Sequence, residues 1–86
     1  MRIYVAAEFL QANDERACGK DVWRKAKTKI ERRAGWKPMS GPLSGCWRVR
    51  VGDYRCVFEA IDDELVLVLA LAHRREIYDI AQARRG

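Results

Sequence analysis

The sequence has few of the residues that most often bind metals or form disulfide bonds. Its 86 residues include one histidine and three cysteines, Cys18, Cys46 and Cys56, an odd number at wide spacing. This set indicates neither a zinc site nor a disulfide framework, and free cysteines are typical of a reducing cytoplasm. No carboxylate pair has the isolation expected of a metal site, and no glycine-rich phosphate loop is present. We therefore expect a cytoplasmic protein with no metal and no cofactor.

Long hydrophobic runs are also missing. The longest apolar run covers residues 65–72, whereas a membrane-spanning helix needs about 20 residues. The first residues, MRIYVAAEFL, carry one basic residue and a short apolar run that polar residues soon interrupt. This pattern is not that of a signal peptide. We expect no contact with a membrane.

Positive charge, by contrast, is plentiful. Seventeen Lys and Arg residues stand against twelve Asp and Glu residues, for a net charge of +5. Hydrophobic residues make up 49% of the chain and charged residues 34%, a balance typical of a soluble globular protein. The length predicts one domain over residues 1–86. The charge favours a polyanionic partner, nucleic acid first.

The first half of the chain predicts one strand and two helices. A strand is predicted over residues 2–7 and a short helix over residues 8–18, which stops at Gly19. A second helix is predicted over residues 21–34, ended by Gly35, because apolar residues recur there at every fourth position. These residues are Val22, Ala26, Ile30 and Ala34.

The other faces of the second helix are basic. We interpret Lys25, Lys29, Arg32 and Arg33 as candidate RNA-binding residues that steer RNA towards a site elsewhere. The alternative is an ordinary solvated helix face, because long cationic side chains are common on exposed helices.

Over residues 46–58, apolar residues recur at every second position on each side of a turn, as they do in two paired strands. Arg48 and Arg50 stand between the apolar residues of a half-buried strand. Gly52 and Asp53 suit a two-residue hairpin turn with glycine at the first central position. The resulting pairs are Val51 with Tyr54, Arg50 with Arg55, Val49 with Cys56, Arg48 with Val57, and Trp47 with Phe58.

A third strand follows the turn IDDE at residues 61–64. We expect the pairs Ala60 with Leu65, Arg55 with Ala70, and Val57 with Val68. Four leucines, Leu65, Leu67, Leu69 and Leu71, then join a core face beneath the two helices. The other face becomes a shallow, positively charged concavity. It holds Val66, Val68, Ala70 and Ala72 together with Arg48, Arg50, Arg55 and Arg74.

These four arginines are interpreted as a preformed anion site. Arg50 directly opposite Arg55 destabilises a strand pair by roughly 0.2–1 kcal/mol, so stability gives no reason for the arrangement. Guanidinium groups bind phosphate oxygens bidentately and stay protonated. The alternative is a set of surface arginines neutralised by Glu59 and water.

Tyr78 follows Arg74 by four residues, which places both on one side of the chain whether it is helical or extended. Tyr78 is thus a candidate general base or proton relay; the alternative is a tyrosine that packs on the sheet edge. His73 points towards the core side, and we interpret it as a structural, hydrogen-bonded histidine. Any chemistry here is expected to be metal-free cleavage of RNA, in which a 2′-hydroxyl attacks the adjacent phosphate.

The run PLSGCWRVRVGDYRCVFEAIDDELVLVLALAHRREIY, residues 42–78, resembles the RelE/ParE superfamily of bacterial type II toxins. The hallmark of that superfamily is L-x-G-x-(W/Y)-R-x-R-x-G-x-Y-R, followed by an apolar strand and an R-x-x-x-Y segment. Before residue 42 only the order of strand and helices agrees. The resemblance implies an α+β fold with an N-terminal strand, a helical hairpin and a twisted, mainly antiparallel sheet.

RelE-like members are ribosome-dependent endonucleases that cut mRNA by 2′-hydroxyl attack without a metal, and so inhibit translation. By motif position, Arg48 and Arg50 stand where these toxins have basic residues, often lysines, that contact the substrate. Arg55 and Arg74 match the arginines that hold the phosphate, and Tyr78 matches the tyrosine implicated in activating the hydroxyl. Arginine in place of lysine keeps the charge but weakens a role in proton exchange.

ParE-like members share the fold and much of RVGDYR, but they poison DNA gyrase and commonly lack the complete basic set with its tyrosine. The complete set favours the RelE-like activity here. A third interpretation is a module that binds RNA without cleaving it. The resemblance also implies partners: a cognate antitoxin bound in a hetero-oligomer, the ribosome and mRNA.

Overall fold

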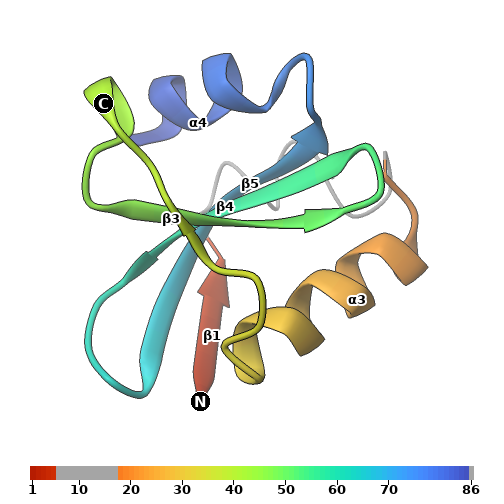
Figure 1. Cartoon of the computed structure of the whole chain (residues 1–86), viewed down its shortest axis with the longest axis vertical. Coiled ribbons are helices and arrows are strands. Elements are labelled where there is room, and N and C mark those ends of the chain that lie inside the picture. The colour runs from red at the N-terminus through yellow and green to blue at the C-terminus, as the bar shows by residue number, and fades with distance from the viewer. Residues whose placement is uncertain (6–17, 86) are drawn as a thin grey trace.

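The computed structural model describes residues 1–5 and 18–85. In chain order the elements are β1 (Arg2–Val5), α3 (Lys20–Glu31), β2 (Lys37–Pro38), the 3-10 turn η1 (Gly41–Leu43), β3 (Cys46–Val51), β4 (Tyr54–Ala60), β5 (Leu65–His73) and α4 (Ile77–Arg85). The strands form one sheet in the order β1-β5-β4-β3-β2 (Figure 1). Strand β1 runs parallel to β5, and the other neighbours are antiparallel.

The expected α+β class and the mainly antiparallel sheet are confirmed. The first strand begins at residue 2 as predicted, and residues 6–17, with most of the first predicted helix, lie outside the described residues. Within the described ranges, no helix is long and apolar enough to cross a bilayer.

The β3–β4 hairpin has the predicted register. All five expected pairs are present, including Arg50 opposite Arg55 and Val49 opposite Cys56. Gly52 has φ +60° at the turn, a conformation that residues with a Cβ rarely adopt. A two-residue turn fixes the register of both strands, so the hairpin could be predicted from its sequence.

The predicted pairing of β4 with β5 is wrong. Ala60 pairs with Val66, Arg55 with Ala72, and Val57 with Ala70. The register shifts between Val57 and Phe58, where Leu69 is the extra residue on β5. A β-bulge of this kind reverses which side chains face which side of the sheet. Val66 and Val68 therefore lie on the face predicted for the leucines.

Both faces of the sheet carry a core, which corrects the prediction of one core beneath two helices. Helix α3 covers one face, where Ile30 packs with Phe58, Val49 and other buried residues. Helix α4 lies over the other face, where Ile77 packs with Val57 and other buried residues (Figure 1). The face predicted as an open arginine concavity is thus covered over part of its length.

Helix α3 ends three residues before the predicted end at residue 34. Arg33 has φ +54°, and its N–H donates to Ile30 O at 3.1 Å while the N–H of Ala34 donates to Lys29 O at 2.9 Å. These two bonds form a Schellman motif with arginine in the left-handed position usually taken by glycine. The predicted apolar stripe is correct at Ala26 and Ile30, which are buried, while Ala34 is exposed.

Shortening a buried isoleucine in either core should destabilise the fold. Ile30→Ala and Ile77→Ala each remove a buried side chain, one from each face, and each is expected to lower the free energy of unfolding by about 2–5 kcal/mol. Denaturant unfolding followed by circular dichroism measures the change. Ile61→Ala is the matched control, because Ile61 is 53% exposed. A change at Ile77 as small as that at Ile61 would contradict the second core.

Candidate active site

The β3–β4 hairpin presents three of the predicted arginines on the face that α4 covers. Arg48 and Arg50 lie on β3, and Arg55 lies on β4 directly opposite Arg50. Strand β2 adds a fourth cation, because Lys37 pairs with Arg48. Lys37 was not predicted as part of the site, because it stands in a segment whose Gly, Pro and Ser content predicts a loop. The result is a row of like charges across three neighbouring strands.

Arg55 is the buried member of this row, with 9% of its surface exposed. Its Nη1 donates to Gly52 O at 2.8 Å and to Tyr54 O at 2.9 Å. Arg50 Nε donates to the same Gly52 carbonyl at 3.3 Å. The hairpin turn therefore orients its carbonyl dipoles towards the guanidinium groups, which partly offsets the cost of burying a charge.

The remaining two residues lie after β5, Arg74 in the connection to α4 and Tyr78 at the start of that helix. The N–H of Arg74 donates to Asp53 O at 2.8 Å, so the chain leaving β5 lies against the turn. Tyr78 lies in the first turn of α4, beside the fully buried Ile77, and its side chain is 41% exposed. Both side chains are thus accessible to a ligand.

The five predicted residues interact electrostatically around Arg55. Burial lowers the pKa of the Arg55 guanidinium; Arg50, Arg48 and, more weakly, Arg74 lower it further, while Tyr78 acts in the opposite direction. A lowered pKa means that folding disfavours the charge on Arg55, although arginine stays protonated at neutral pH. A bound anion would relieve this repulsion.

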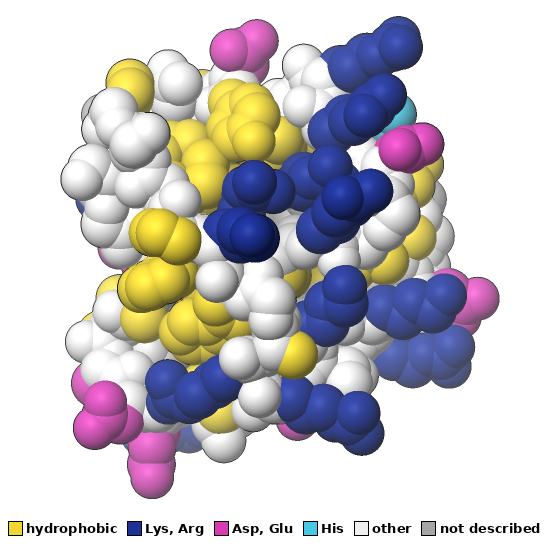
Figure 2. Space-filling model, in the orientation of Figure 1, with side chains coloured by type: hydrophobic (Ala, Val, Ile, Leu, Met, Phe, Trp, Pro, Cys, Tyr) yellow, Lys and Arg dark blue, Asp and Glu magenta, His cyan; other side chains and the backbone are white. Residues whose placement is uncertain are grey.

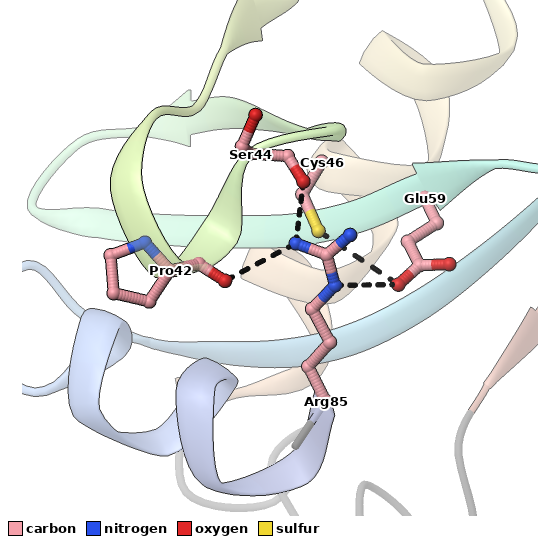
Figure 3. A network of polar contacts seen from close by, with 5 residues as sticks. All are labelled: Pro42, Ser44, Cys46, Glu59 and Arg85. Carbon is pink, nitrogen blue, oxygen red and sulfur yellow. Dashed lines mark hydrogen bonds and ion pairs between the residues drawn. The ribbon is translucent and has the colours of Figure 1, made fainter.

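Glu59 does not neutralise the arginines, contrary to the alternative considered from the sequence. Its Oε1 lies 3.2 Å from Arg85 Nε and accepts the Cys46 thiol at 3.9 Å (Figure 3). This cluster was not predicted. The sequence feature that could have indicated it is the pair Arg84 and Arg85 at the end of a helical segment, where cations commonly bond to carbonyl groups. His73 is half-buried, and its Nδ1 accepts the N–H of Arg75 at 3.2 Å, as expected of a structural histidine.

The basic residues of α3 lie beside the hairpin tip. An open groove of about 590 Å³ is lined by Arg24, Lys25, Thr28, Lys29, Arg32, Ala34, Val51 and Gly52. Lys29 Nζ also donates to the backbone carbonyl of Arg50, so the groove lies on the α3 side of the strand whose other face carries Arg48 and Arg50. Figure 2 shows Lys and Arg side chains gathered on the side of the molecule where α3, the hairpin tip and the start of α4 lie.

Arg33 stands apart from the other predicted RNA-binding residues. Its guanidinium donates to Asp63 O and lies 5.3 Å from the ring centroid of Trp36. These contacts, with its role in ending α3, give Arg33 a structural function. Across residues 1–5 and 18–85, no three His, Cys, Asp or Glu side chains gather as metal ligands.

Comparison with known proteins identifies the family. Residues 5–78 match the family described as ParE toxin of type II toxin-antitoxin system, parDE. The fold resembles a chain of the RelB-RelE antitoxin-toxin complex from Methanococcus jannaschii, with 22% identity, a TM-score of 0.65, and coverage of 88% of this chain and 95% of that one. It also resembles a chain of the toxin-antitoxin complex RelBE2 from Mycobacterium tuberculosis, with 22% identity, a TM-score of 0.60, and coverage of 84% and 88%. No curated protein matches.

A family match over most of the chain and a fold shared with toxin structures define the class. The chain belongs to the ParE toxin family of type II toxin-antitoxin systems, and the predicted membership of the RelE/ParE superfamily is confirmed.

Removal of one exposed arginine should raise stability while weakening anion binding. Arg50→Gln removes the charge opposite Arg55, so we expect the free energy of unfolding to rise by roughly 0.2–1 kcal/mol and the affinity for an RNA oligonucleotide to fall. Urea unfolding and RNA titration at two salt concentrations measure the two effects. Arg2→Gln, on β1, is the matched control, and a loss of stability at position 50 would contradict the repulsion.

The Cys46 thiol should make the fold sensitive to alkaline pH. Burial raises its pKa; the charge of Arg85 opposes this, and the charge and hydrogen bond of Glu59 add to it. The folded state therefore holds the thiol proton more tightly than the unfolded state, and this stabilisation is lost as pH rises through the folded-state pKa.

Above about pH 8.5, the free energy of unfolding should fall more steeply for the wild type than for Cys46→Ala. The difference in slope is at most about 1.4 kcal/mol per pH unit. Unfolding curves from pH 7 to pH 11 measure it, and the other titrating groups cancel in the comparison. Parallel pH profiles would show that the thiol is not buried as described.

Proposed function

We propose that the chain is the toxin of a type II toxin-antitoxin system and that it cleaves mRNA in the ribosome, which inhibits translation and arrests growth. The supporting observation is that Arg48, Arg50 and the buried Arg55 share one face of the hairpin, whose turn accepts the N–H of Arg74, and that Tyr78 interacts electrostatically with Arg55. Such a cluster of fixed cations beside a phenol suits a phosphodiester that acquires charge during reaction.

In the proposed reaction the 2′-hydroxyl of the RNA attacks the adjacent phosphorus. The bond from phosphorus to the 5′-oxygen breaks, so the products are a 2′,3′-cyclic phosphate and a 5′-hydroxyl. Tyr78 acts as a proton relay: its oxygen accepts the proton of the attacking hydroxyl while its own proton passes, directly or through water, to the leaving 5′-oxygen, so that the phenol is neutral before and after the reaction. No arginine is a base at neutral pH, so the four arginines hold the phosphate and stabilise its developing charge.

The buried and the exposed arginines have different roles in this proposal. Arg55 is fixed by two carbonyl groups and supplies a charge that does not reorient during reaction. Arg50 and Arg74 are exposed and can grip phosphate oxygens bidentately. Lys25 and Lys29 on α3, with Arg32 just after its end, guide the flanking RNA along the groove towards the cluster.

The proposed partners are the ribosome, mRNA and a cognate antitoxin. The two related structures are antitoxin-toxin complexes, and we propose the same kind of hetero-oligomer here. An antitoxin that covers the cationic surface would suppress its activity.

The family match favours a second candidate, the ParE-like poisoning of DNA gyrase without cleavage of RNA. This function needs a protein-binding surface and no proton acceptor at position 78. The two candidates therefore differ in their dependence on the Tyr78 hydroxyl.

Tyr78→Phe should lower the rate of mRNA cleavage by about 10²-fold or more, and Arg74→Ala by about 10²–10³-fold. Mapping of transcript ends after brief induction measures cleavage in cells. Tyr4→Phe is the matched control, because Tyr4 is an exposed tyrosine on β1. Intact messages, an induced SOS response and a fully toxic Tyr78→Phe variant would instead identify the gyrase poison.

A further inference from the structure

Arg85 attaches the last turn of α4 to two separate parts of the chain. Its Nε lies 3.2 Å from Glu59 Oε1 on β4, and its Nη1 donates to Ser44 O at 2.6 Å and to Pro42 O at 3.3 Å (Figure 3). The Arg85 and Glu59 side chains are only 31% and 28% exposed. Charge-assisted bonds in such a partly buried place are stronger than those of exposed pairs.

The neighbouring backbone is shaped to receive this guanidinium. Gly45 has φ +95°, and a Cβ there would lie 3.3 Å from Arg85 Nη2. Arg84 makes a second attachment, because its Nη1 donates at 3.0 Å to the carbonyl of Leu69, the extra residue of the β5 bulge. Arg84 thus binds a carbonyl at the bulge of the sheet, and Arg85 binds carbonyls of the connection between β2 and β3.

Helix α4 links these attachments to the candidate active site. Tyr78 lies in its first turn and Arg85 at its end, about 10 Å apart at 1.5 Å per residue. A helix of nine residues is only marginally stable alone, so its position depends on its contacts. Ile77 and Ala81 bury one side of α4, but such contacts are non-directional. The contacts of Arg85, by contrast, are directional, and they attach the far end of the helix to β4 and to the connection between β2 and β3.

We propose that Arg85 and Glu59 form a latch that positions Tyr78 beside the arginine row, so that both are positioning residues for cleavage. The inference rests on the proposed function, in which Tyr78 assists the reaction. Both residues would then act at a distance from the reacting atoms, because Arg85 and its partner Glu59 meet at the end of α4 opposite to Tyr78.

A double-mutant cycle tests the latch. Cleavage rates on ribosomes programmed with mRNA are measured for the wild type, Arg85→Ala, Tyr78→Phe and the double variant. Arg85→Ala should lower kcat on the order of 10- to 100-fold, as misplacement of a reacting group by about 1 Å does, with KM nearly unchanged. In the Tyr78→Phe background the same substitution should lower kcat less than twofold. An equal loss in both backgrounds, or no loss in the wild type, overturns the proposal.

Two control pairs separate positioning from folding. Arg2→Ala is matched to Arg85→Ala, and Glu31→Gln is matched to the milder Glu59→Gln, which keeps the shape of the side chain. If Arg85→Ala does not fold, Glu59→Gln takes its place in the cycle. It should lower kcat by a smaller factor, and again only when Tyr78 is present. An equal effect of Glu31→Gln, at an exposed position on α3, would contradict a specific role for Glu59.

Hydrogen exchange distinguishes failure of the latch from failure of the proposed function. The backbone amides of α4 should exchange faster in Arg85→Ala than in the wild type, while those of α3 stay unchanged. If Tyr78→Phe cleaves as fast as the wild type, the proposed role of Tyr78 fails and the positioning proposal with it. If Tyr78→Phe is slow but α4 exchange is unaltered in Arg85→Ala, the latch alone is wrong.

Discussion

Mutual repulsion of guanidinium groups at one end of the β3–β4 hairpin constrains the rest of this structure. Among residues 1–5 and 18–85, no carboxylate forms an ion pair with Arg48, Arg50, Arg55 or Arg74. The turn compensates with the carbonyls of Gly52 and Tyr54, which accept the buried guanidinium. Neutral dipoles reduce the cost of the buried charge without cancelling it. The cluster therefore keeps its net charge for a ligand.

The need to cover both faces of the sheet explains why the site lies where it does. Helix α3 buries Ile30 on one face, and α4 buries Ile77 on the other. Helix α4 cannot extend over the hairpin tip, because Arg74 is bonded to Asp53 there and the helix begins only at Ile77. The arginine row thus lies at the margin of a hydrophobic core, with packed residues beneath it and water above.

The local parts of this fold could be predicted from the sequence, and the irregular parts could not. Gly52 and Asp53 fixed the hairpin register, and with it the grouping of Arg48, Arg50 and Arg55. The β5 register was missed because Leu69, the bulge residue, is one leucine among several. The α3 end was missed because Arg33 takes a conformation that sequence rules assign to glycine. Contacts such as Arg85 with Glu59 depend on distant segments, which no local pattern encodes.

The parallel pairing of β1 with β5 has a consequence for synthesis of the chain. Residues 2–5 pair with residues 65–68, so the first strand cannot join the sheet until most of the polypeptide exists. Such nonlocal pairing is slow to form, and translation at roughly 5–20 residues per second leaves the early strand unpaired for seconds. Arg74 and Tyr78 are translated later still. The first strand, Arg74 and Tyr78 therefore take their places in the fold only once nearly the whole chain has been made.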